Sequence, residues 1–594
     1  MPTCPNPACQ HVSEATDFCP RCQRSMRAPA PPRSPAGRVP CVGWRLRWRH
    51  ALPRHEVAAL PCLPGLLLPI AGSEADGCAV FAIEERRRPQ QVTVWLAERE
   101  PIDAALTLVR GLARLLIDWH QRGYLCGDIQ LDTLFIDEAG AVAIAGIVPL
   151  PIDQAAWLRP LPASAGFDAP EIRNRDAARV GTASDVYALA ATLVGVAERL
   201  PRFADFGDLE VLAHQFVPRH PQVPPPMHGW LRRSLAMNSK ERFPDVAAQL
   251  QALEEAWRPR PPSEAALRLS GGSATRPGWC KLCAADDERD DGEINADRAL
   301  FLSEAKPLRQ LVLVADGITA CTIGSGARAA TIVETTVREL WPSIRSADDV
   351  ASALRTANER IVAEAAQLCA ARSQEPEARG LMAASVAALY NDGRQAELIT
   401  CGDVRAYLWS ADRGLALLSA DDHAGVARIV RGRPLGAACD GSEEALTACI
   451  GMARREDSGL VAQPPPLRRR PLALGPDDVL VLCSDGLTDY LIRQTGKGRW
   501  AAELMLETRI AEAVQRQFGM KQLANYLASA ADVNGGGDNI TVMCLRCQPL
   551  PLPAEGHAVP RSPAPSVPAP RSPAAKRVSE AAPVPSITHG NQQP

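Results

Sequence analysis

The chain has 594 residues, of which 46% are hydrophobic, and its 65 basic and 68 acidic side chains leave a formal net charge of -3. At roughly 150 residues per domain, this length excludes a single domain and predicts several separate cores. The balanced charge excludes a strongly basic nucleic-acid or acidic-membrane surface and favours a protein or small-molecule partner.

No apolar run approaches the roughly 20 residues that cross a bilayer, and the first residues do not resemble a secretory signal. Three C-x2-C pairs occur among the 18 cysteines. Paired cysteines in a chain of this kind are typical of metal binding in a reducing compartment, so we expect a cytoplasmic protein.

Proline-rich segments divide the sequence. Residues 27–40, 258–279 and 549–594 are rich in Pro, Ala, Ser and Gly and have little to bury, which predicts two linkers and a disordered tail. The pieces that remain are residues 1–26, 41–257 and 280–548. We therefore expect a multidomain α+β protein.

The first piece has the pattern C-x4-C-x9-C-x2-C, formed by Cys4, Cys9, Cys19 and Cys22. Four thiolates complete a tetrahedral zinc shell. So short a piece cannot build an ordinary core, so metal binding would supply most of its folding free energy. The pattern resembles a bacterial zinc ribbon, which is usually a docking element. The alternative is four unrelated buried cysteines.

The second piece contains a strongly periodic segment at residues 102–123. Its apolar positions recur every three or four residues and predict an amphipathic helix: Ala105, Val109, Leu112, Leu116 and Trp119. We expect Asp103 to cap its start and Gly123 its end. Two apolar runs that follow, on either side of residues 138–140, predict a β-hairpin.

Further along the second piece are the motifs GFDAPE (166–171), SDVYALA (184–190) and ERFPDV (241–246). In this order, residues 100–256 resemble the C-terminal lobe of a eukaryotic-type protein kinase. The resemblance implies a two-lobed fold, a buried ion pair between Glu171 and Arg242, and an aspartate, Asp185, that holds the loop around Asp128 from below.

The residues that transfer phosphate in this family are replaced here. Cys126, Gln130 and Thr133 stand at the positions of the catalytic-loop histidine, lysine and metal-binding asparagine, and Ile144 stands at that of the second magnesium ligand. The first of only six lysines is Lys240, so no lysine precedes it to pair with nucleotide phosphates. We predict a pseudokinase that binds proteins; the alternative is an unrelated helical domain.

The third piece places aspartates at the ends of predicted strands. Buried apolar runs lead into Asp-Gly at 316–317 and Ser-Asp-Gly at 484–486, and further aspartates occur at positions 297, 403 and 538. Carboxylates delivered by separate strands can converge on a magnesium or manganese site. A single Asp-Gly is most often a turn, but five such positions in order favour a metal site.

This order resembles the metal-dependent protein phosphatases of the protein phosphatase 2C type, across residues 280–548. The resemblance implies an α/β/β/α sandwich of two antiparallel sheets, and residues 324–340 and 347–368 have the periodicity of its helices. It implies two manganese or magnesium ions held by Asp297, Asp316, the carbonyl of Gly317, Asp485 and Asp538. Asp403 stands where bacterial members help to bind a third ion.

The implied reaction is hydrolysis of phosphoserine or phosphothreonine in a protein by a metal-activated water, with Asp316, Asp485 and Asp538 as the catalytic residues. A phosphoprotein, and a cognate kinase or its target, are the expected partners. The arginine with which the family grips phosphate is replaced by Gly292, and Arg289 and Arg298 are out of register. A non-catalytic scaffold and a bifunctional kinase and phosphatase are the alternatives.

Two C-x2-C pairs flank the third piece, Cys280 with Cys283 and Cys544 with Cys547. If the first and last strands are neighbours, as in the family, the four thiolates would bind a second zinc ion. The alternative is that Cys544 is a core residue and the other three are incidental.

Overall fold

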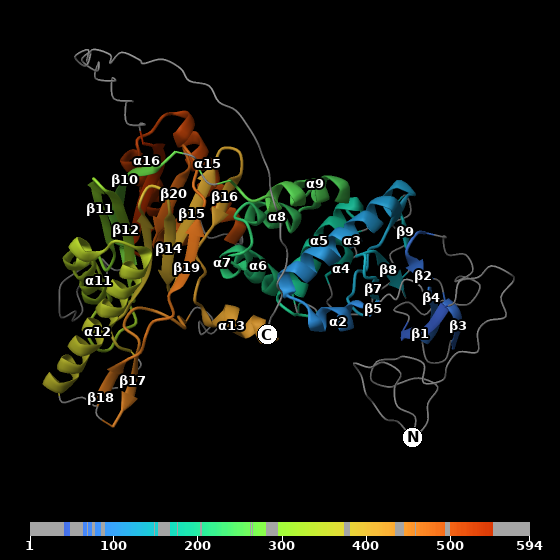
Figure 1. The fold of residues 1–594 in the computed structure, drawn as a ribbon, viewed down its shortest axis with the longest axis horizontal. Helices are drawn as coiled ribbons and strands as arrows, with labels where there is room; N and C mark the ends of the chain where they lie inside the picture. Colours follow the sequence, from blue (N-terminus) through green and yellow to red (C-terminus); the bar gives the residue numbers. More distant parts are fainter. Residues whose placement is uncertain are drawn as a thin grey trace, which may run out of the picture. The chain divides into compact units, whose positions relative to one another are not determined.

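The structure, a computed structural model, is drawn in Figure 1. It describes residues 41–47, 63–67, 69–73, 78–84, 90–145, 147, 149–152, 167–174, 176, 178–201, 203, 205–261, 263, 265–280, 295–372, 380–433, 445–457, 459–492 and 499–550. The predicted ribbon cysteines, Gly292, Cys283 and the proline-rich tail lie outside these residues.

A long helix, α3 (Pro101–Gln121), organises the second piece. Its predicted apolar face is buried and packs against α5 (Thr182–Ala197). Gly123 follows the helix with φ +83°, so its predicted role at the end is confirmed. The prediction for Asp103 is wrong, because Glu100 is the N-cap and Asp103 lies in the first turn, where a carboxylate still favours the helix dipole.

Shorter elements complete this helical body. The other α-helices among its described residues are α2 (Val92–Trp95), α4 (Pro170–Arg173), α6 (Phe206–His214), α7 (Phe216–Arg219), α8 (Met227–Ser234) and α9 (Val246–Trp257). The predicted hairpin is confirmed as β7 (Leu134–Ile136) and β8 (Val142–Ala145), which pair antiparallel. They belong to the sheet β2-β8-β7-β5, with β2 (Leu66–Leu67) and β5 (Gln90–Gln91) at its edges.

Two small sheets are also present. A three-stranded antiparallel sheet has the order β1-β4-β3, from β1 (Cys41–Arg47), β4 (Cys78–Glu84) and β3 (Pro69–Ser73). A two-stranded sheet joins β6 (Tyr124–Leu125) and β9 (Leu150–Pro151).

The loop after β6 is held by Asp185. The backbone N–H groups of Cys126 and Gly127 each donate to its carboxylate at 2.9 Å, which confirms the predicted contact. Within the loop the hydroxyl of Thr133 donates to the carbonyl of Gln130 at 2.9 Å, and both side chains are buried. Burial raises the pKa of the Cys126 thiol well above its usual value. The loop is therefore a buried turn that is held by hydrogen bonds within the protein.

The predicted ion pair between Glu171 and Arg242 is confirmed. The guanidinium donates to both carboxylate oxygens, at 2.7 and 2.9 Å, and both side chains are buried. The hydroxyl of Ser184 donates to the same carboxylate at 2.6 Å. This pair fixes α4 to the segment between α8 and α9.

The third piece is a sandwich of two five-stranded sheets. One has the order β10-β21-β20-β15-β16, formed by Leu267–Arg276, Ile540–Pro549, Val479–Cys483, Arg405–Ser410 and Gly414–Leu417. The other has the order β11-β12-β13-β14-β19, formed by Arg298–Ala305, Leu308–Gly317, Ala384–Asn391, Ala396–Cys401 and Arg468–Leu472. All neighbouring strands in both sheets are antiparallel.

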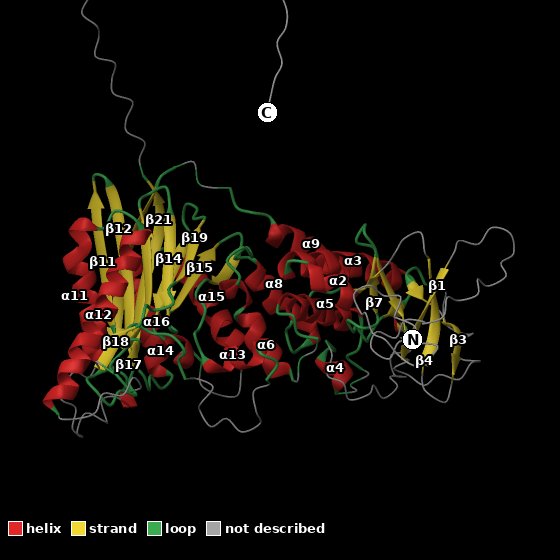
Figure 2. Cartoon of the chain, turned by 60° about the horizontal axis from the view of Figure 1, so that its bottom comes forward, coloured by secondary structure: helices red, strands yellow, loops and turns green. Residues whose placement is uncertain are grey.

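Helices cover the outer faces of the sandwich, as Figure 2 shows. On one side lie α11 (Gly326–Leu340) and α12 (Ala347–Ala371), close to the predicted segments. On the other lie α14 (Asp485–Tyr490), α15 (Arg499–Gln515) and α16 (Met520–Val533). A core between the sheets includes Leu269, Val312 and Leu480. The predicted α/β/β/α arrangement is confirmed.

Smaller elements are the short helix α13 (Ala424–Val430) and the hairpin of β17 (Ala453–Glu456) and β18 (Gly459–Ala462).

The predicted linker at 258–279 is wrong over ten residues. Leu267–Arg276 forms strand β10, which pairs along its whole length with β21. The run has few apolar residues, but Leu267, Leu269 and Ala274 are buried. A Cβ at Gly271 would lie 2.3 Å from the carbonyl oxygen of Cys544, so glycine allows the close approach. The sandwich therefore begins before residue 280.

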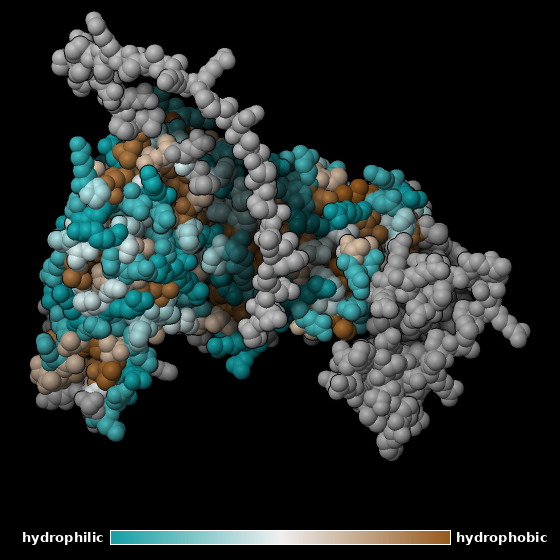
Figure 3. Space-filling view, in the orientation of Figure 1, coloured by the Kyte–Doolittle hydropathy of each residue, from teal (hydrophilic) through white to brown (hydrophobic). Residues whose placement is uncertain are grey.

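Hydrophilic residues cover most of the described surface on the face drawn in Figure 3, with hydrophobic residues scattered among them. Large apolar side chains that are exposed include Met237, Trp279, Leu504 and Val533. Within the described residues, no helix combines the length and apolar character needed to cross a membrane.

The buried ion pair yields a stability prediction. Arg242→Ala leaves Glu171 buried without its cation, so we expect a loss of about 3–5 kcal/mol. Arg110→Ala is the control, because it breaks the solvent-exposed pair between Arg110 and Glu254 and should cost about 0–1 kcal/mol. Urea unfolding of the full chain, followed by tryptophan fluorescence, compares the two. Equal losses would contradict a structural role for the buried pair.

Candidate metal centre

Five aspartates meet at one end of the sandwich. Asp316 is near the end of β12, Asp485 directly follows β20 and Ser484, and Asp403 lies in the turn from β14 to β15. Asp297 directly precedes β11, and Asp538 lies two residues before β21. Antiparallel register brings these positions together, since Arg298 pairs with Ala315 and Arg405 with Cys483. The predicted convergence is thus seen in the structure.

Asp316 is at the centre of the cluster. Burial raises its pKa well above the usual value, and the carboxylates of Asp297, Asp485, Asp403 and Asp538 raise it further. Gly317 follows in close contact with the start of α11, because a Cβ on Gly317 would lie 2.3 Å from the carbonyl carbon of Gly326. Only glycine permits this approach of helix to strand.

Asp297 is 4% exposed and raised in pKa to about 6, first by burial. The hydroxyl of Ser484 donates to its Oδ2 atom at 2.9 Å. Its Oδ1 atom is buried and has no hydrogen-bond partner. Ser484 therefore links Asp297 to the strand end that carries Asp485.

Asp485 begins α14, and burial followed by repulsion from Asp403, Asp489 and Asp538 raises its pKa. A Cβ at the next residue, Gly486, would lie 2.1 Å from the carbonyl oxygen of Asn539. This close packing brings α14 against the segment that carries Asp538.

Asp403 lies at the edge of the cluster beside a residue that we did not predict. Nε2 of His423 and Oδ2 of Asp403 are 3.1 Å apart. Although burial alone lowers the pKa of His423, the hydrogen bond to Asp403 and the charges of Asp421 and Asp403 raise it. The one available signal was the sequence Asp-Asp-His at 421–423, in a chain with only ten histidines.

A buried arginine supports the cluster from one side. The guanidinium of Arg405 pairs with Asp421 at 3.0 Å, donates to the hydroxyl of Thr488 and lies 3.5 Å from Asp489. Thr488 in turn donates to the backbone carbonyl of Asp485 at 3.1 Å. Sequence reasoning missed this network, because the partners of Arg405 lie 16 to 84 residues away from it along the chain.

The residues present fit divalent cations. The buried carboxylates have raised pKa values, and one oxygen of Asp297 has no hydrogen-bond partner. They form a set of oxygen donors without a balancing positive charge, and such donors are the ligands that hard cations prefer. The five carboxylates are spread more widely than the ligands around a single metal ion. Among the described residues, three ligand atoms within 4.8 Å of one another occur instead at His214, His228 and Glu503. Magnesium usually keeps several water ligands, which suits this wider spacing.

The second zinc site predicted from Cys280, Cys283, Cys544 and Cys547 is wrong. Cys544 packs in the core beneath α16, while Cys547 packs in the core between the sheets. Residues three apart on one strand point to opposite faces, so these two thiols cannot bind one ion. The last strand, β21, does pair with the first strand of the sandwich, β10, but β10 lies in the segment that we predicted to be a linker.

Comparison with known proteins adds a family to this geometry. Residues 286–528 match the model of the protein phosphatase 2C family. The match supports a domain of the protein phosphatase 2C type in this segment. Four of the five clustered aspartates lie within the matched residues, whereas Asp538 and strand β10 lie outside them. No curated protein matches the chain.

Solved structures of bacterial phosphatases are also similar to this domain. The serine/threonine phosphatase PstP/Ppp of Mycobacterium tuberculosis is 22% identical, over 48% of this chain and 99% of that one, with a TM-score of 0.32. The catalytic domain of PstP in complex with two manganese ions is 22% identical, over 48% of this chain and 99% of that one, with a TM-score of 0.33. Stp1 from Staphylococcus aureus is 18% identical, over 49% of this chain and 98% of that one, with a TM-score of 0.35.

Mutual repulsion among the five aspartates leads to a prediction about thermal stability, which can be tested without an assay of catalysis. In EDTA, Asp316→Asn removes a carboxylate whose native pKa is raised. Such a carboxylate lowers the stability of the folded wild type more and more as pH rises, and asparagine does not. We expect the variant to unfold about 2–4 °C above the wild type at pH 8, the shift that 1 kcal/mol produces in a domain of this size, and the gap to narrow towards pH 5.

Scanning calorimetry with and without Mn²⁺ checks this, because Mn²⁺ should stabilise the wild type and not the variant. Asp412→Asn is the matched control, since Asp412 is exposed in the turn from β15 to β16. A variant that is less stable than the wild type in EDTA at pH 8 would contradict repulsion among the acids.

Proposed function

We propose that the sandwich hydrolyses phosphoserine and phosphothreonine in proteins, with two manganese or magnesium ions at the aspartate cluster. The observation that carries the proposal is the gathering of five aspartates at one end of the sandwich, in a segment that matches a phosphatase family. Structural ion pairs also perturb pKa values, but here like charges are brought together, an arrangement that costs stability unless a cation binds.

In this proposal Asp297, Asp316, Asp485, Asp538 and the carbonyl of Gly317 hold the two ions, and Asp403 at the edge helps to hold a third. When bound, such ions neutralise phosphate charge and lower the pKa of a water molecule towards neutrality. Asp316, surrounded by four other carboxylates, would be the central residue among those that hold the ions.

The chain's own residues prepare this site. Ser484 orients Asp297 by its hydrogen bond, and Arg405 fixes the position of α14 through Thr488. The guanidinium of Arg298 already has partners in the protein, because its Nη1 atom donates to the carbonyls of Asn295 and Asp297. The proposal therefore gives the grip on phosphate to the ions rather than to Arg298.

For the helical body we propose a pseudokinase that recognises or regulates, and for Cys4, Cys9, Cys19 and Cys22 a zinc ribbon that docks a partner. The buried turn around Asp128 supports the first of these. A phosphoprotein, and a cognate serine/threonine kinase or its target, are the proposed partners, in the cytoplasm. The alternative is a scaffold that binds phosphoproteins without hydrolysis.

The test measures phosphate release from p-nitrophenyl phosphate and from a phosphothreonine peptide by the full chain. We expect activity with Mn²⁺, none with EDTA, and a loss on the order of 100-fold in Asp485→Asn, since loss of a ligand weakens both metal binding and charge neutralisation. Asp412→Asn should keep wild-type activity. Absence of turnover with Mn²⁺ and with Mg²⁺ would favour the scaffold.

A further inference from the structure

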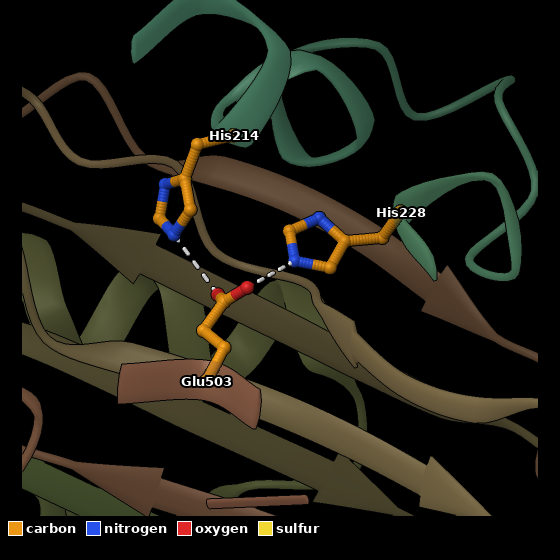
Figure 4. A group of neighbouring side chains, drawn as sticks. All are labelled: His214, His228 and Glu503. Atoms are coloured by element: carbon orange, nitrogen blue, oxygen red, sulfur yellow. Dashed lines mark hydrogen bonds and ion pairs between the residues drawn. The ribbon is translucent and has the colours of Figure 1, made fainter. Parts of the chain in front are cut away.

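A buried group of three side chains joins the helical body to the sandwich. His214 ends α6, His228 lies in α8 and Glu503 lies in α15. Figure 4 shows both imidazole rings turned towards one carboxylate. The Nε2 atoms of His214 and His228 are 2.9 and 2.7 Å from separate oxygens of Glu503. The side chains are only 2%, 0% and 1% exposed.

Trp500 packs against both histidine rings. Its ring centroid lies 5.2 Å from that of His214 and 5.1 Å from that of His228. Burial alone raises the pKa of Glu503, but the two imidazoles outweigh it and hold the pKa well below its usual value. An ionised carboxylate only accepts hydrogen bonds, so each histidine donates one from Nε2.

The contacts of Gln215 distinguish between two ways of holding this group together, a bound metal ion or hydrogen bonds. Its Oε1 atom accepts from the backbone N–H of Asp421 at 2.8 Å, which fixes the orientation of the amide. The Nε2 atom of Gln215 therefore faces Nδ1 of His214, 3.1 Å away, and donates to it. His214 must then carry its own proton on Nε2, the atom that a zinc ion would need, so the group is held by hydrogen bonds.

The same glutamine contacts the network beside the metal centre. Asp421, whose N–H it accepts, pairs through its carboxylate with Arg405, and Arg405 reaches Thr488 and Asp489 in α14. Thr488 donates to the backbone of Asp485. Two residues after Asp421, His423 contacts Asp403. A chain of polar contacts thus runs from Gln215 to Asp485, and the backbone from Asp421 to His423 leads on to Asp403.

We propose that Gln215 is a positioning residue for the metal centre, held in place by His214, His228 and Glu503. Through Asp421 and Arg405 it keeps Asp485 and Asp403 at the spacing that binds the ions. The helical body is then a structural part of the phosphatase site, because the contact of Gln215 with Asp421 sets the affinity for metal. This inference rests on the proposed metal-dependent function.

The test compares full-length variants by the Mn²⁺ concentration that gives half of the maximal rise in unfolding temperature, a readout that needs no catalysis. Gln215→Leu removes both hydrogen bonds at similar volume. We expect its Mn²⁺ midpoint to rise about tenfold, as loss of a residue that orients metal ligands commonly does. The Mn²⁺ concentration for half-maximal hydrolysis of p-nitrophenyl phosphate should rise by the same factor.

The matched control is Arg232→Met. Arg232 in α8 pairs with Glu507 in α15, across the same contact, but does not touch Asp421. It should lower the unfolding temperature and leave the Mn²⁺ midpoint unchanged. Equal midpoints for Gln215→Leu and the wild type overturn the proposal. If the wild type binds Mn²⁺ but has no turnover, the midpoint comparison still decides it, whereas a wild type without any Mn²⁺ response overturns this inference and the proposed function together.

A second variant separates hydrogen bonds from a metal at the histidines. In Glu503→Gln the amide can accept from His214 and donate to Nε2 of His228, whose Nδ1 atom has no partner and is free to take the proton. We therefore expect a wild-type Mn²⁺ midpoint and unchanged zinc content. Loss of one zinc ion per chain in this variant, measured by plasma mass spectrometry, would overturn the assignment of hydrogen bonds.

Discussion

Repulsion among five aspartates that share one end of a β-sandwich is the constraint on which the surrounding structure depends. Transfer of carboxylates out of water costs several kcal/mol each unless a partner compensates. The chain supplies only part of that compensation, through the hydroxyl of Ser484 beside Asp297 and the charge of Arg405, which opposes the rise in the pKa of Asp485. As a group of anions, the cluster therefore lowers the stability of the fold.

Strand register and small residues make this gathering of charges possible. In antiparallel sheets the end of one strand lies beside the start of the next, so Asp485 after β20 lies near Asp538 before β21, and Asp316 in β12 lies near Asp297 before β11. Glycines at 317 and 486 then allow helices to approach the strand ends within distances that any side chain would block. Because a slip of one residue turns each side chain to the other face, the register itself determines whether a site exists.

Much of this could be predicted because the signals are local. Apolar runs that end in Asp-Gly identify β12 and β20, and helical periodicity identifies α3, α11 and α12. The contacts that were missed join distant residues, such as Gln215 with Asp421 or His214 with Glu503, which are separated by 206 and 289 residues. No local pattern contains them. The error at Cys544 and Cys547 was avoidable, because alternation along a strand already separates residues three apart.

Strand β10 has a consequence for how the sandwich can exist outside the whole chain. It covers β21 along ten residues, and it lies only a short distance after the end of α9. A fragment that starts at residue 280 would lack this cover and leave β21 with a row of unpaired backbone groups. Such an edge is a template for pairing with another chain, so that fragment would be prone to aggregate. The sequence before residue 280 therefore protects the sandwich against self-association.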